Sequence, residues 1–124
     1  MRHVEKKSSS DYHVEQKLWG HEEWIENNPE FCGKLLYFDR GKHSSMHFHA
    51  EKQETMYCLK GMFTIKFIDT DSGERYMIDL SETESIFIPR NTPHEIWGIS
   101  EKNILVEFST YHEDEDSYRI GRPG

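Results

Sequence analysis

The sequence predicts a single all-β domain, and three observations carry that prediction. Short runs such as 62–68, with Phe63, Ile65 and Phe67 on one face, alternate apolar and polar positions as half-buried strands do. Turn residues separate these runs, and no ten-residue window before residue 110 keeps a helical period. The chain has 124 residues, which suffices for one core and leaves little room for a second domain. Many short strands of this kind form a sandwich or a barrel.

In the first half of the chain we expect a polar N-terminal arm followed by the first strands of the domain. Residues 1–16 are polar and aperiodic, so we expect a mobile N-terminal arm over the first ten residues and an edge strand from Tyr12 to Gln16. The domain itself should span 17–124, with Trp19 and Trp24 packing in the core or at its rim. An Asn-Asn-Pro turn at 27–29 precedes two predicted strands, 31–38 and 43–49.

The second half continues with strands and ends in an acidic segment. Runs 53–59 and 62–68 are predicted to pair as a hairpin around Lys60-Gly61. After a loop at 69–73, the remaining predicted strands are 75–80, 84–88, 94–99 and 103–109. The stretch 111–121 is expected to be a solvated tail that packs Tyr118 and Ile120 onto the barrel.

Composition excludes several classes of function. The formal charge of −8 makes nucleic acid a poor partner, because its binding depends on basic surface. No apolar stretch approaches the ~18 residues of a membrane span, and the first ten residues lack the apolar segment of a secretory signal. Cys32 and Cys58 do not form a Cys-x-x-Cys pair, so we expect buried free thiols and a cytoplasmic location.

A cluster of histidines and one glutamate predicts a metal site. His47 and His49 are two residues apart, so on a strand both imidazoles point to the same side. If 53–59 pairs antiparallel with 44–49, Glu54 reaches the same point, and His94 follows a Pro-Arg-Asn-Thr-Pro turn as a fourth candidate. Three imidazoles and a carboxylate suit zinc, manganese, iron, nickel or copper. His43 shares the strand face and competes with His47 as a ligand.

These residues resemble the cupin superfamily. Gly41, His47, His49, Glu54 and Gly61 follow the spacing of its complete first motif, which omits His43. Pro89, Asn91 and His94 follow the second motif, in which Thr83 and Asn91 replace glycines and Gly98 replaces an asparagine. Asn tolerates the left-handed backbone, so the turn before His94 should survive. The resemblance implies an antiparallel jelly-roll β-barrel, also called a double-stranded β-helix, with one divalent metal inside, a small-molecule substrate and a homodimer.

A closer resemblance concerns the cupin domain of type II mannose-6-phosphate isomerases. It includes Trp19-Gly20 with Glu23, the turn 88–94 and the ending 106–119, although the chain has no room for the nucleotidyltransferase domain often fused to that family. It implies a metal-dependent sugar or sugar-phosphate isomerase or epimerase that moves a proton through an enediolate. His47, His49, Glu54 and His94 would hold the metal.

The remaining roles are assigned from residue type. Glu107 and His112 are the candidates for acid–base catalysis, Glu107 because it interrupts an otherwise apolar strand. Substrate candidates are the cations Lys34, Arg90 and Arg119, which suit a phosphate, and the aromatics Tyr57 and Trp97, which would line the mouth of the site.

Other functions fit the same ligands. An iron-loaded site would serve a cupin dioxygenase, and a metal-stabilised barrel would bind sugar without chemistry. A barrel whose histidines only pack is the fourth reading, and it leaves buried polar groups short of partners.

Overall fold

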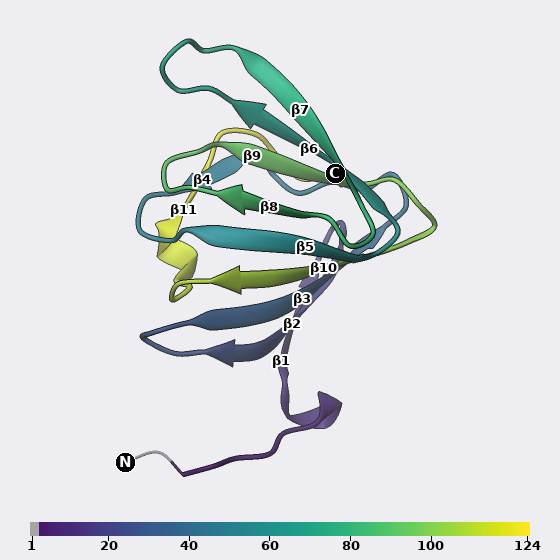
Figure 1. The fold of residues 1–124 in the computed structure, drawn as a ribbon, viewed down its shortest axis with the longest axis vertical. Coiled ribbons are helices and arrows are strands. Elements are labelled where there is room, and N and C mark those ends of the chain that lie inside the picture. The colour runs from purple at the N-terminus through teal and green to yellow at the C-terminus, as the bar shows by residue number, and fades with distance from the viewer. Residues whose placement is uncertain (1–2) are drawn as a thin grey trace.

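The computed structural model describes residues 3–124 and forms two facing antiparallel sheets (Figure 1). The first sheet has the order β1-β2-β3-β10-β5-β8, and the second has the order β11-β4-β9-β6-β7. The described chain contains no α-helix, only the 3-10 turns Ser9–Asp11 and Asp114–Asp116. This arrangement confirms the predicted all-β jelly-roll barrel.

The strands alternate between inward and outward residues, which is why the sequence showed period-two patterns. The strands of the first sheet are β1 (His13–Lys17), β2 (Gly20–Asn27), β3 (Cys32–Asp39), β10 (Lys102–Ser109), β5 (Glu54–Lys60) and β8 (Ser85–Ile88). Those of the second are β11 (Ser117–Arg119), β4 (His47–His49), β9 (His94–Gly98), β6 (Met62–Ile68) and β7 (Arg75–Ser81).

The hydrophobic core lies between the two sheets. Phe63 and Ile65 of β6 face Met56 and Cys58 of β5, and all four are buried. Trp19 stacks on Phe38 at the edge of this cluster, so Trp19 packs in the core as expected. Cys32 and Cys58 are buried free thiols, as predicted.

Two predicted pairings are wrong. The run 53–59 does pair, but β5 lies between β10 and β8, whereas β4 lies in the opposite sheet between β11 and β9. The predicted hairpin with 62–68 fails for the same reason, because the turn at Gly61 carries the chain from one sheet to the other. Here β4 and β5, and likewise β5 and β6, are consecutive strands in different sheets, so adjacency in sequence does not give the strand partner at these positions.

Gly61 and two turn residues show where the backbone departs from ordinary geometry. Gly61 has φ +79°, and a Cβ there would meet the Lys102 carbonyl. Thr83 and Asn91, which replace motif glycines, both adopt positive φ, 76° and 61°. The second turn therefore survives without glycine, as expected from the tolerance of Asn for this conformation.

The predicted N-terminal edge strand is confirmed, whereas the C-terminal segment differs from its prediction. The edge strand β1 covers 13–17, while the mobility expected for the first ten residues falls partly on residues 1–2, which lie outside the described residues. The C-terminal segment is not only a solvated tail: Tyr118 and Ile120 are 47% and 54% exposed, whereas Asp116 is buried. Figure 1 shows this yellow segment beside β4, with which β11 pairs.

The predicted strand 43–49 is shorter than expected. Only His47–His49 forms β4, and His43 instead makes an isolated bridge with Trp97 and stacks on its ring. His43 therefore faces away from the other imidazoles, which removes it as a competing ligand.

Candidate metal centre

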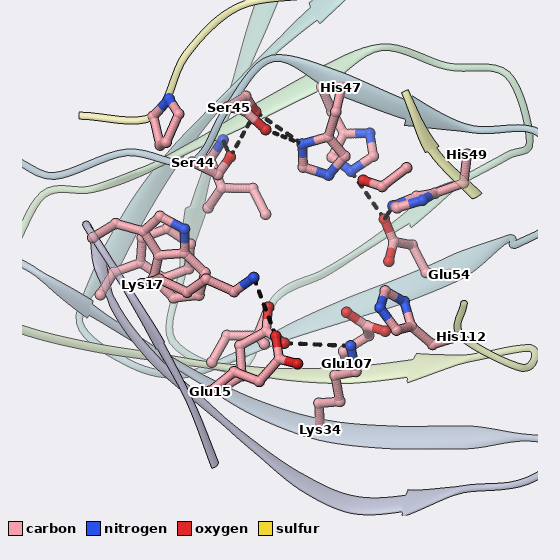
Figure 2. A pocket seen from close by; sticks show the side chains of 18 of the residues that line it. Glu15, Lys17, Lys34, Ser44, Ser45, His47, His49, Glu54, Glu107 and His112 are labelled. Carbon is pink, nitrogen blue, oxygen red and sulfur yellow. Dashed lines mark hydrogen bonds and ion pairs between the residues drawn. The ribbon is translucent and has the colours of Figure 1, made fainter. Parts of the chain in front are cut away.

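The four predicted ligands converge between the two sheets. His47 and His49 come from β4, and His94 opens β9 directly opposite His47 in the ladder. Glu54 opens β5 in the facing sheet. Figure 2 shows His47, His49 and Glu54 turned toward one another. The convergence was predicted correctly, but Glu54 reaches the histidines across the interior of the barrel and not along a shared ladder.

The distances fit one shared cation. One nitrogen from each of the three histidines lies within 4.8 Å of the other two. Glu54 Oε1 lies 3.0 Å from His94 Nε2 and 3.8 Å from His49 Nε2. Glu54 Oε1 and His94 Nε2 are fully buried, and their 3.0 Å contact does not have the geometry of a hydrogen bond, so neither atom has a hydrogen-bond partner among the described residues. Because leaving buried polar atoms unsatisfied is costly, these two orphans favour a metal at this point.

Hydrogen bonds to the far nitrogen orient each imidazole. In all three histidines, Nδ1 lies within hydrogen-bond distance of a backbone carbonyl, which leaves Nε2 free to face the cluster. The contacts are His47 Nδ1 to Ser45 O at 3.0 Å, His49 Nδ1 to Asp116 O at 3.1 Å and His94 Nδ1 to Thr92 O at 2.9 Å. Metal-binding histidines are commonly held in this way.

Burial also keeps two imidazoles neutral, which a metal ligand requires. Desolvation lowers the pKa of His47 well below its usual value, and the neighbouring His94 and His49 lower it further. Desolvation and the Lys52 ammonium lower the pKa of His49 to about 4, against the opposing attraction of Glu54. The donor set of three imidazoles and one carboxylate therefore suits a divalent transition metal.

A buried charged network adjoins the ligands, and its centre is Lys52. The Lys52 ammonium lies 3.3 Å from Glu54 Oε2, 3.1 Å from Glu107 Oε2 and 3.0 Å from His112 Nδ1. His112 Nε2 in turn lies 2.9 Å from Asp114 Oδ1. Glu107 and His112, the predicted acid–base residues, are thus brought next to the metal ligands, and Figure 2 shows both beside Glu54.

Charge interactions set the ionisation of Glu107. Burial is the largest single influence and raises the pKa of Glu107, but Lys52 first, and then Lys34 and His112, together hold that pKa below its usual value. Burial, followed by the Lys52 charge, lowers the pKa of His112. Glu107 is therefore ionised and His112 neutral at pH 7.

A second buried lysine lies farther from the ligands. Lys34 is 1% exposed, with Nζ 3.4 Å from Glu22 Oε1 and 4.1 Å from the centre of the Trp24 ring. The Trp24 indole donates to the same Glu22 oxygen at 2.9 Å. The Lys34 ammonium is thus paired with Glu22 and the Trp24 ring in the wall of the cavity.

The ligands open onto a cavity of about 560 Å³. Of the predicted substrate and catalytic residues, Lys34, Glu107, His112 and Arg119 line it. The other three do not. Tyr57 lies on the outward face of β5, Arg90 donates from an exposed turn to Glu51 O, and Trp97 packs against His43. Their placement away from the cavity corrects the expected role of these three in substrate contact.

Two important residues were missed by the sequence reasoning. Lys52 was passed over because a lysine between two motif positions resembles an ordinary surface charge. Asp116 was assigned to a solvated tail, yet its carboxylate accepts hydrogen bonds from the amides of Ala50, Glu51 and Lys52. The only available signal was the run of acids in this segment, which does not reveal which acid turns inward.

Comparisons with known proteins agree with this geometry. A family model described as "Cupin domain" matches residues 34–111, more than half of the chain. Among curated proteins, none matches this sequence. Within the described residues there is no helix long and apolar enough to cross a membrane.

Solved structures with the same fold come from larger chains. The capsular polysaccharide assembling protein CapF from Staphylococcus aureus is 18% identical with a TM-score of 0.80, covering 92% of this chain and 34% of CapF. A mutant of Bacillus subtilis oxalate decarboxylase is 16% identical with a TM-score of 0.81, covering 97% and 34%. Another structure of that decarboxylase, described by its Mn(II) centres, is 18% identical with a TM-score of 0.79 and the same coverage. The chain spans about a third of these proteins, and identities this low show the fold alone.

Proposed function

The chain belongs to the cupin domain family, and from this premise we propose that it is a metal-dependent isomerase or epimerase acting on a sugar or sugar phosphate. Within the family, the proposed activity is that of the type II mannose-6-phosphate isomerases. The observation that carries the proposal is the position of an ionised carboxylate, Glu107, beside the four-ligand centre and on the wall of the same cavity.

The ligand set would hold one divalent metal, with zinc, manganese, iron and nickel all compatible with three imidazoles and a carboxylate. When bound, the metal supplies a Lewis acid that stabilises negative charge on substrate oxygens. His47, His49, Glu54 and His94 are the residues that would hold it, since they converge with two otherwise unpartnered buried atoms.

In this proposal Glu107 moves the proton. Isomerisation of an aldose to a ketose removes a proton from the carbon beside the carbonyl and returns it to the neighbouring carbon. Glu107 Oε2 accepts from Lys52 and Ser109, while no described residue donates to Oε1. Oε1 is therefore the oxygen available to accept and return the proton, and a nearby charge keeps the carboxylate in its basic form.

His112 supports the network. Lys52 donates to Nδ1, so the Nε2 hydrogen points to Asp114. Both ring nitrogens are engaged, and we assign His112 to holding the Lys52 ammonium in place.

Arg119 is the candidate for the anionic group of the substrate. It lies opposite His47 in the β11–β4 ladder, lines the cavity and forms no ion pair with any described residue. A guanidinium fork suits phosphate oxygens. Lys34 has less capacity for this role because Glu22 and Trp24 already engage its charge.

The experiment is a turnover assay with purified protein, added divalent metal and a panel of aldose and ketose phosphates that includes mannose 6-phosphate and fructose 6-phosphate. We expect interconversion by the protein, no turnover by His49→Ala and full turnover by His43→Ala, whose imidazole lies outside the cavity. Absence of turnover across the panel, or substrate-dependent consumption of dioxygen with iron(II), would contradict the proposal.

We also propose a homodimer in the cytoplasm. The two buried free thiols support a reducing compartment. Sedimentation equilibrium checks the dimer, and fractionation of the source cells checks the compartment.

A further inference from the structure

Lys52 has no hydrogen-bond donor left for a substrate. Its side chain is 3% exposed, and an ammonium group carries three donors. Three acceptors lie within reach of Nζ, namely Glu54 Oε2 at 3.3 Å, Glu107 Oε2 at 3.1 Å and His112 Nδ1 at 3.0 Å. All three donors are therefore committed to the protein itself, and the role of Lys52 must be exerted through these neighbours.

The two carboxylates that share Lys52 lie on one face of neighbouring strands. In the β10–β5 ladder Ser109 is opposite Glu54 and Glu107 is opposite Met56, so Glu107 and Glu54 are diagonal neighbours facing the interior. Glu54 directs Oε1 to the histidines and Oε2 to Lys52. Glu107 is thus a second buried carboxylate beside the ligand set.

We propose that Lys52 is a positioning residue that keeps Glu107 off the metal and thereby leaves coordination positions open for substrate oxygens. A divalent cation attracts any ionised carboxylate in reach, and a buried carboxylate without a partner is costly. Lys52 and Ser109 both donate to Glu107 Oε2, which holds this side chain away from the other four donors. Without the ammonium, the metal is the nearest compensating charge for Glu107.

The inference rests on the metal site proposed above and not on the isomerase reaction. It also explains how the barrel can place a fifth potential ligand beside the metal without filling the site. In this arrangement Lys52 maintains two conditions for the proposed chemistry, an open metal and a free carboxylate.

The test uses Mn²⁺ as the probe and counts the exchangeable waters on the bound ion by solvent proton relaxation. Removing the charge with Lys52→Met or Lys52→Gln should lower the count by one, because Glu107 replaces a water. The same variants should bind Mn²⁺ roughly tenfold more tightly, because affinity rises with the number of charged ligands. Lys52→Arg, which keeps the charge, should retain the original water count.

The double variant Lys52→Met/Glu107→Gln separates positioning from a general structural effect. It removes the migrating carboxylate, so it should return to the original water count, and circular dichroism should show the β signal of the unchanged protein. Either neutral variant that folds is sufficient for the test. The inference is overturned if a folded neutral variant keeps every water, or if the double variant also loses one.

The outcomes separate this inference from the proposed function. If the unchanged protein fails to bind Mn²⁺, Zn²⁺, Fe²⁺ or Ni²⁺, the metal site and this inference both fall. If the waters change as expected but no sugar phosphate turns over, the inference stands and only the isomerase proposal falls.

Discussion

The two halves of the centre are held by different means. On one side, each histidine is fixed by a bond from Nδ1 to a backbone carbonyl, so its position follows from the strand and turn that carry it. On the other side, Lys52, Glu107 and His112 are fixed by one another's side chains. The positions of the histidines therefore depend on the backbone fold, whereas the positions of Lys52, Glu107 and His112 each depend on the other two.

This difference predicts how each half responds to substitution. The carbonyls that orient the histidines belong to the backbone, so they stay in place when a side chain is replaced. Replacing one histidine should therefore remove only the metal affinity that this histidine contributes. In the charged half, one substitution leaves another buried charge without its partner, so effects should be strongly non-additive.

The largest effect is expected for the ligands themselves. His94→Ala should weaken binding of the metal by more than about 100-fold, since replacement even of a residue that only supports a ligand costs 10–100-fold. Metal content after dialysis, by elemental analysis, measures this. His43→Ala is the matched control and should retain metal, because His43 stacks on Trp97 outside the cavity. Full metal content in His94→Ala would mean that this imidazole is not a ligand.

The next effect concerns pH in metal-free protein. The pKa of His49 is about 4 in the folded protein and 6.5 as its ordinary value, so on acidification the unfolded chain takes up the proton first. Stability is therefore complete above pH 6.5 and falls between pH 6.5 and 4, by about 2 kcal/mol from pH 7 to 5 for this residue alone. Urea unfolding in the presence of a chelator measures the loss, to which His47 should add.

His49→Asn provides the control for that prediction. It removes the titrating ring, so the slope of stability against pH should become shallower. An equal slope in His49→Asn and in the unchanged protein would show that other groups dominate the acid response.

A smaller effect is expected where the C-terminal segment supports the ligand half. Asp116→Asn should lower the free energy of unfolding by about 2 to 3 kcal/mol, because a buried charged acceptor of three backbone amides is lost. Urea unfolding measures it, with Asp71→Asn in an exposed loop as the control. Weaker metal binding should accompany the loss, because the side-chain hydrogen bonds of Asp116 hold in place the segment whose backbone carbonyl orients His49. Equal stability of the two variants would contradict the assigned role.

The smallest effect concerns Thr83, one of the two residues other than glycine with a left-handed backbone. Thr83 is β-branched and has φ 76°, so Thr83→Gly should raise stability by up to about 1 kcal/mol. Thr92→Gly, at a position with ordinary φ, should lower it. Thermal unfolding compares them. A decrease for Thr83→Gly as large as that for Thr92→Gly would show that the conformation carries no strain.

The sequence predicted the half that depends on local spacing. His47 and His49 point the same way because they are two apart on a strand, and His94 follows its turn, so the motif alone placed all three imidazoles. Most of the strands and the absence of long helices followed from period-two patterns, whereas β2 and β11 were not predicted as strands. These features depend on residues close together in the chain.

The charged half was not predictable in the same way. Lys52 meets Glu107 across 55 residues, and Asp116 meets the 50–52 amides across more than 60. The predicted partners of β5 failed for the same reason, since β4 and β6 both lie in the opposite sheet. Glu107 was singled out because a charge in an apolar strand has a local signature, whereas a lysine between two motif positions has none.

The strap formed by Asp116 and β11 has a consequence for biosynthesis. The carbonyl that orients His49 belongs to a residue 67 positions later, so this ligand cannot be aligned while the final strand is still in the ribosomal exit tunnel. We therefore expect the proposed metal to be bound productively only after β11 has left the tunnel and paired with β4.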